Sequence, residues 1–121
     1  MIIYLLAITT LIFPFQPPQA PVLEVLEPSR YIIQELDKNG IDSDFGLLVA
    51  RCESSLNLKA THINKNGSND AGIWQINSIH KLSDECRFDL KCSTDWVIEK
   101  VKRDKGWSAW ACARKVKNPS K

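Results

Sequence analysis

The chain has 121 residues, of which 44% are hydrophobic and 25% charged. This length has room for one domain, and the composition is that of a globular protein. The formal net charge is only +2, and the basic excess gathers near the C-terminus without a motif for binding nucleic acid. We therefore expect no nucleic acid as a partner.

The first 28 residues differ from the rest of the chain. Residues 1–15 are almost wholly apolar and carry no charge, and five of the six prolines lie between Pro14 and Pro28. An apolar run of this length is too short to span a bilayer, which takes about 20 residues, and matches the core of a signal peptide. No Lys or Arg precedes it, so an uncleaved anchor at residues 2–15 stays open as an alternative. We expect export to the periplasm, the cell surface or the exterior, with membrane contact only through this segment. The predicted organisation is a signal peptide or anchor with a proline-rich linker (1–28), a domain (29–117) and a tail (118–121).

Two helices are predicted at the start of the domain. Ser29 can cap a helix that runs to Asp37, and Gly40 stands where a C-terminal cap belongs. One of the polar residues 42–44 caps the second helix, whose apolar run continues to Glu53.

A polar stretch follows the second helix. Asn66-Gly67 is a strong signal for a tight turn. The segments 61–63 before this turn and 71–76 after it are expected to form a short hairpin. The hairpin would be the β part of a mainly helical α+β domain.

The remaining elements are again helical. Ser93 or Thr94 is expected to cap a helix that stops near Gly106. Ser108 is expected to begin a last short helix.

The cysteines are Cys52, Cys86, Cys92 and Cys112. Four cysteines suit two disulfides in an oxidising compartment, and three pairings are possible. The short separation of Cys86 and Cys92 favours a bond between them, which leaves Cys52 to join Cys112. A zinc site is the weaker alternative because no Cys-x-x-Cys is present, and residues 64–70 lack the ligands of a calcium loop. We expect no metal ion and no cofactor.

Two carboxyl groups in this sequence occupy contrasting environments. Glu53 ends an apolar helix, where desolvation would raise its pKa and keep it able to protonate a leaving oxygen. Asp70 stands among polar turn residues, which would keep it ionised. Such a pair is the pattern expected for glycoside cleavage.

Three segments together form a recognisable block: Glu53-Ser54, Asn64-Lys65-Asn66-Gly67-Ser68-Asn69-Asp70, and Gly72-Ile73-Trp74-Gln75-Ile76-Asn77-Ser78-Ile79-His80. The block resembles the lysozyme-like superfamily, most closely the small lytic transglycosylases of the secretion-associated and phage type, and is also similar to chicken-type lysozymes. Trp107-Ser108-Ala109-Trp110 extends the resemblance more loosely. The resemblance implies a small, mostly helical fold in which the hairpin forms one wall of a cleft.

The resemblance also implies roles for individual residues. Glu53 would protonate the oxygen of the β-1,4 bond between N-acetylmuramic acid and N-acetylglucosamine in peptidoglycan. Gln75 would bind the sugar or, alternatively, only tie the hairpin together. Trp107 would stack on a sugar ring or, alternatively, pack in the core, and Trp74 is expected in the core. The substrate-binding candidates are Ser54, Asn64, Gln75, Asn77 and Trp107.

The resemblance leaves three functions open. A lytic transglycosylase uses one glutamate and leaves a 1,6-anhydro sugar, whereas a muramidase would also use Asp70 and release a reducing end. We favour the transglycosylase, because Cys52 directly precedes Glu53 and four cysteines depart from the chicken-type pattern. An inactive glycan-binding or assembly module on the same fold is the third alternative. The expected partner is the peptidoglycan glycan strand, bound by a monomer, and a role in a secretion system or in phage assembly stays open.

Overall fold

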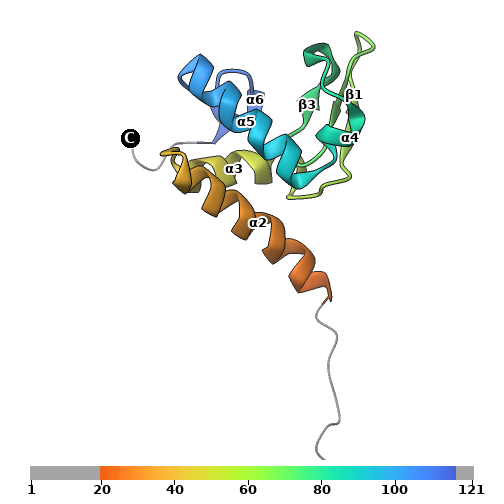
Figure 1. The fold of residues 1–121 in the computed structure, drawn as a ribbon. Helices are drawn as coiled ribbons and strands as arrows, with labels where there is room; N and C mark the ends of the chain where they lie inside the picture. Colours follow the sequence, from red (N-terminus) through yellow and green to blue (C-terminus); the bar gives the residue numbers. More distant parts are fainter. Residues whose placement is uncertain (1–19, 117–121) are drawn as a thin grey trace, which may run out of the picture.

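The structure is a computed structural model that describes residues 20–116, with side chains from residue 27 onward. The predicted apolar leader and the tail at 118–121 lie outside the described residues. Figure 1 shows a set of helices with a small sheet at one end, which confirms the predicted α+β class. Among residues 20–116, no helix combines the length and the apolar character that crossing a bilayer requires.

Helix α2 begins earlier than the sequence predicted. It spans Ala20–Lys38 and continues through Pro28, whereas a start at Ser29 was expected. A proline inside a helix removes one backbone hydrogen bond. Packing offsets this cost, because Ile32 and Leu36 of the same helix are fully buried. The domain boundary at residues 28 and 29 stays a prediction.

Helix α3 (Ser43–Ser54) begins as predicted and carries Glu53 near its end. The Asp42 carboxylate caps it by accepting a hydrogen bond of 3.2 Å from the amide of Phe45. Gly46 lets α3 approach α2 closely, since a Cβ at this position would lie 2.3 Å from Leu36 Cδ1. This close contact anchors the first turns of α3 against α2.

The sheet has three short antiparallel strands in the order β1 (Thr61–Ile63), β2 (Asn69–Ala71) and β3 (Ile76–Asn77). The predicted turn at Asn66-Gly67 is confirmed, because it joins β1 to β2. The predicted second strand at 71–76 is wrong. Gly72 adopts a φ of +84° directly after β2, so the chain turns there and returns as β3.

Four further helical segments complete the described chain: η1, a 3-10 helix (Ser78–His80), α4 (Asp84–Arg87), α5 (Leu90–Asp104) and α6 (Ala111–Lys115). Helix α4 was not predicted. The predicted caps of the last two helices are wrong. Asp89 caps α5 by accepting a hydrogen bond of 2.7 Å from the amide of Cys92, and Ser93 and Thr94 are buried inside that helix. Helix α6 starts after Ser108, because residues 107–110 form a turn in which Trp110 N donates to Trp107 O at 3.0 Å.

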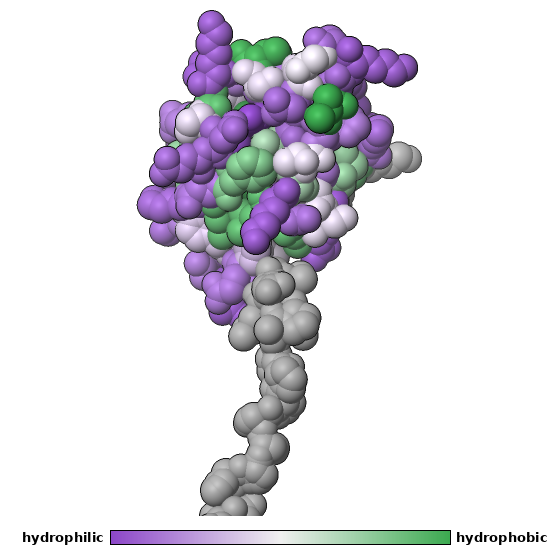
Figure 2. All heavy atoms as spheres, turned by 90° about the vertical axis from the view of Figure 1, so that its right-hand side faces the viewer, coloured by the Kyte–Doolittle hydropathy of each residue, from purple (hydrophilic) through white to green (hydrophobic). Residues whose placement is uncertain are grey.

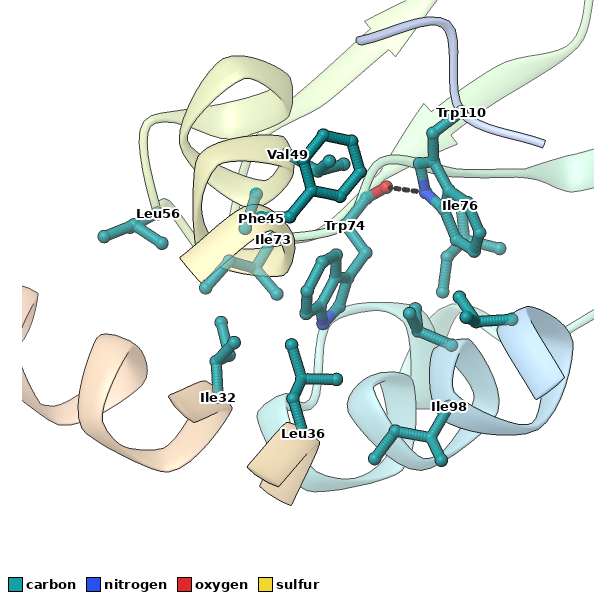
Figure 3. Packing of buried hydrophobic residues seen from close by; sticks show 13 residues of the cluster. Ile32, Leu36, Phe45, Val49, Leu56, Ile73, Trp74, Ile76, Ile98 and Trp110 are labelled. Carbon is teal, nitrogen blue, oxygen red and sulfur yellow. Dashed lines mark hydrogen bonds between the residues drawn. The ribbon is translucent and has the colours of Figure 1, made fainter. Parts of the chain in front are cut away.

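The core lies between α2, α3, α5 and the turn after β2. Trp74 from that turn is fully buried at its centre, as predicted (Figure 3). Its indole N–H donates to the Thr94 hydroxyl at 3.0 Å, and its backbone carbonyl accepts a hydrogen bond of 2.9 Å from the indole of Trp110. The buried tryptophans are therefore satisfied as hydrogen-bond donors, which is the condition for burying them without penalty.

Both predicted disulfides are confirmed. One joins Cys86 to Cys92 between α4 and α5, and the other joins Cys52 in α3 to Cys112 in α6. The second bond connects segments 60 residues apart. It attaches the C-terminal helix to the end of α3.

Candidate active site

A cleft of about 280 Å³ lies between the end of α3, the sheet, α5 and the segment before α6. It brings together four of the predicted site residues, Glu53, Asp70, Gln75 and Asn77. The other residues that line it are Ile76, Ile79, His80, Trp96, Ala109, Trp110 and Ala111. Segments far apart in the sequence thus meet around the two carboxyl groups.

The Glu53 carboxyl is half-buried in this cleft. Burial raises the pKa of Glu53 above its ordinary value, and the neighbouring charge of Asp70 acts in the same direction. The amide of Cys112, which donates to Glu53 Oε2 at 3.3 Å, and the charge of Lys115 lower the pKa. Burial is the largest of these influences, so the pKa is raised overall, the direction that the sequence position predicted.

The Asp70 carboxylate is held by two side-chain amides. Asn77 Nδ2 donates to Asp70 Oδ1 at 2.7 Å, and Asn64 Nδ2 donates to Asp70 Oδ2 at 3.1 Å. These bonds fix the orientation of the carboxylate at the cleft wall. Asn64, a predicted substrate-binding residue, acts on Asp70 and does not itself line the cleft.

The side chains of Gln75 and Asn77 line the cleft but also hold its wall together. Gln75 Nε2 donates to the carbonyls of Ala60 at 3.0 Å and Gly72 at 2.8 Å. Asn77 Oδ1 accepts from the amide of Ile79 at 2.9 Å, while its amide nitrogen serves Asp70. The alternative role considered for Gln75, a structural tie, is therefore present in the fold.

Ser54 and Trp107 lie outside the cleft. The Ser54 hydroxyl donates to the carbonyl of Ile73 at 2.8 Å and so ties α3 to the turn after β2. Trp107 packs against the rings of Trp74 and Phe45, with centroids 5.8 and 6.0 Å away, and borders a separate hollow of about 420 Å³. Its contacts match the packing alternative.

The cleft has an aromatic rim, of which Trp110 belongs to the segment that extended the resemblance, whereas His80 and Trp96 were missed by sequence reasoning. The ring of His80 lies 5.0 Å from that of Trp96, which in turn lies 6.4 Å from Trp110. Burial lowers the pKa of the His80 imidazole, and the charge of Lys100 adds to this effect, so the neutral ring is favoured. Only the place of His80 at the end of the motif block hinted at this role, because Trp96 looked like a core position of its helix.

The exposed side of the cleft is partly apolar. Ile79, which lines it, is 68% exposed, and the apolar side chains of Ile76 and Ala109 also line it. Figure 2 shows one face of the molecule, where hydrophobic side chains interrupt a mainly hydrophilic surface. Apolar and aromatic surfaces beside hydrogen-bonding groups suit a ligand with both apolar faces and polar edges, as a pyranose ring has.

Comparison with known proteins agrees with the geometry. Residues 30–95 match the family described as Transglycosylase SLT domain, a match that runs from α2 into α5 and includes both carboxyl groups. Lysozyme 2 of Lucilia sericata is 34% identical over 82 residues, which is 52% of this chain and 56% of the relative. The chain thus spans about half the length of this curated relative. On the match over residues 30–95, the chain belongs to the transglycosylase SLT domain family, within the lysozyme-like superfamily.

Proposed function

We propose that this protein is a peptidoglycan lytic transglycosylase that cleaves the β-1,4 bond between N-acetylmuramic acid and N-acetylglucosamine. The observation that carries the proposal is the half-buried Glu53 carboxyl, whose pKa is raised by burial within a cleft. A carboxylic acid with a raised pKa keeps its proton to a higher pH than an ordinary glutamic acid and can serve as a general acid. The family match and the similarity to a protein named lysozyme support the substrate class.

In the proposed reaction, Glu53 acts twice. As the bond from the muramic acid C1 to the bridging oxygen breaks, the Glu53 proton goes to that oxygen, which leaves as a hydroxyl of the departing sugar. The Glu53 carboxylate then accepts the proton of the C6 hydroxyl while O6 bonds to C1. The products are a 1,6-anhydro sugar end and a new sugar hydroxyl, and the acid is regenerated without water.

A muramidase is the second candidate, and Asp70 is the observation that favours it. This carboxylate lines the same cleft and is oriented by Asn64 and Asn77. In a hydrolase it would stabilise or attack the sugar cation, and water would complete the reaction. In the transglycosylase, Asp70 instead fixes the wall and raises the pKa of Glu53 through its charge.

Mass spectrometry of the sugar ends released from purified peptidoglycan separates these functions. The transglycosylase predicts 1,6-anhydro ends, and reducing ends would instead establish the hydrolase. Asp70→Asn should cause a modest loss of activity in the first case and a severe loss in the second. A protein that binds peptidoglycan but releases no muropeptide would be the inactive module.

Glu53→Gln is the direct test of the catalytic assignment. The amide keeps the shape of the side chain but has no proton of suitable acidity, so clearing of peptidoglycan should fall by at least about a hundredfold, the scale of general acid catalysis. Circular dichroism checks that the variant is folded. Clearing at the wild-type rate by the folded variant would exclude Glu53 as the acid.

We further propose that the protein acts on glycan strands outside the cytoplasm, as a monomer. Both disulfides support an oxidising compartment, since such bonds are rare where thiols are kept reduced. Alkylation of thiols in intact cells, followed by mass spectrometry, should find all four cysteines blocked from reaction. Alkylated cysteines in the protein from freshly harvested cells would contradict export.

A further inference from the structure

The Cys52–Cys112 disulfide adjoins the proposed acid from both sides. Cys52 directly precedes Glu53 in the sequence, and the backbone amide of the other partner, Cys112, donates to Glu53 Oε2 at 3.3 Å. Helix α6 has no side-chain cap from Trp110, so the Glu53 carboxyl satisfies an amide that would otherwise lack a partner in the first turn. The same bond therefore fixes the acid and the group that orients it.

Helix α6 depends on outside contacts for its position. It has only five residues, too few to be stable as an isolated helix in water. Trp110 and Ala111, at its start, line the cleft beside Glu53. If the covalent link were lost, this wall would be held by non-covalent packing alone.

We propose that the Cys52–Cys112 disulfide is a positioning element of the active site, which holds the α6 wall and the Cys112 amide against Glu53 and so keeps the acid oriented and shielded from water. This inference rests on the proposed role of Glu53. It goes beyond stabilisation of the fold, because it assigns to one of the two disulfides an effect on the chemistry of the cleft.

The groups around Glu53 set the direction of the effect. Burial and the charge of Asp70 on β2 raise its pKa, while the Cys112 amide and the charge of Lys115, both on α6, lower it. Release of α6 removes the two lowering influences and much of the burial. We take the loss of burial, the largest influence, to outweigh the loss of the two lowering ones, so the pKa of Glu53 should fall toward its ordinary value. The alkaline limb of the activity profile follows the pKa of the acid, so it should move to lower pH.

The experiment uses the full chain with Cys86→Ala and Cys92→Ala, which leaves Cys52–Cys112 as its one possible disulfide. Dithiothreitol reduces this bond to two thiols and is itself oxidised to a cyclic disulfide. Release of muropeptides is measured against pH before reduction, after reduction and after reoxidation. We expect the alkaline limb to move reversibly to lower pH and turnover to fall roughly ten- to a hundredfold, the scale of a displacement of about 1 Å at a catalytic group.

The pKa of Glu53, followed by NMR of its carboxyl carbon in the oxidised and reduced protein, gives a readout that does not require activity. A fall on reduction supports the positioning role, and an unchanged or raised pKa in folded protein overturns it. If reduction unfolds the protein, Cys52→Ala with Cys112→Val, in which valine fills the space of the buried sulfur, allows the same comparison. An oxidised enzyme that releases no muropeptide would refute the proposed function, while the NMR comparison would still decide the positioning role.

Discussion

The two disulfides close loops of very different length, which leads to a quantitative prediction about stability. Cys52 and Cys112 are separated by 60 residues, and Cys86 and Cys92 by 6. In the chain-entropy description, the longer loop restricts the unfolded chain by about 4 kcal/mol and the shorter by about 2 kcal/mol. Loss of Cys52–Cys112 should therefore lower the free energy of unfolding by about 2 kcal/mol more than loss of Cys86–Cys92.

The structure makes the two disulfides a matched pair for this comparison. Each consists of one buried cysteine, Cys112 or Cys86, both 7% exposed, and one exposed partner. The packing lost on replacement by alanine is therefore similar in the two cases. The difference between the double variants then reports mainly on loop length.

Urea unfolding, followed by tryptophan fluorescence, measures the difference between the two alanine double variants. All four tryptophans lie within the described residues and contribute to the core or its margin. With a slope of about 2 kcal/mol per molar urea, the unfolding midpoints of the two double variants should differ by about 1 M. Equal midpoints, or a larger loss for the Cys86–Cys92 variant, would refute the argument from loop length.

Three further predictions concern single side chains. Because the pKa of Glu53 is raised in the fold, its stabilising contribution is complete below the ordinary value of 4.5 and lost as pH rises through the folded pKa. Glu53→Gln should thus become more stable relative to the wild type as pH rises. A difference in the free energy of urea unfolding between the two proteins that stays constant across pH would contradict this. Gly72→Ala should lower the free energy of unfolding by more than about 2 kcal/mol, since its Cβ would lie 1.8 Å from a carbonyl oxygen at the end of α4. Gly67→Ala is the control: it has open space around it and should cost about 1–2 kcal/mol for its positive φ alone. Equal shifts of the thermal midpoint would contradict the steric reasoning. Thr94→Val leaves the buried indole N–H of Trp74 without an acceptor and should lower the free energy of unfolding by about 1–3 kcal/mol, while Thr94→Ser keeps the bond and should cost less. If calorimetry finds the serine variant less stable than the valine variant, the argument from this bond is wrong.

The features predicted correctly are those encoded over short distances. The apolar run before Glu53 and the polar residues ahead of it specify helix α3, because capping and periodicity act within a few residues. The pairing of Cys86 with Cys92 followed from their separation, and the remaining pair then had no alternative partners. The small α+β fold came from the resemblance carried by the motif block.

The features predicted wrongly depend on contacts between distant residues. Thr94 looked like a helix cap, but its hydroxyl bonds to Trp74, 20 residues away, and Asp89 takes the capping role. The second strand was placed too late because a strand of three residues has no readable alternation, and the turn at Gly72 is imposed by its close approach to α4. Trp96 reaches the cleft because the fold brings α5 close enough to η1 for its ring to meet that of His80, which no local pattern reveals.

Most polar side chains of the motif block form hydrogen bonds with one another or with the backbone and do not point free groups into the cleft. The amides of Asn64 and Asn77 are occupied by Asp70, and that of Gln75 by backbone carbonyls. These residues are therefore needed first to build the wall, and changes to them should alter the sheet before they alter ligand binding. Glu53 differs from them, because among the described contacts its carboxyl accepts one long hydrogen bond of 3.3 Å, which leaves acceptor and donor capacity turned toward the cleft. Of the two carboxyl groups in the cleft, Glu53 is thus the one less tightly held by hydrogen bonds, and this is why we place the chemistry on Glu53 and not on Asp70.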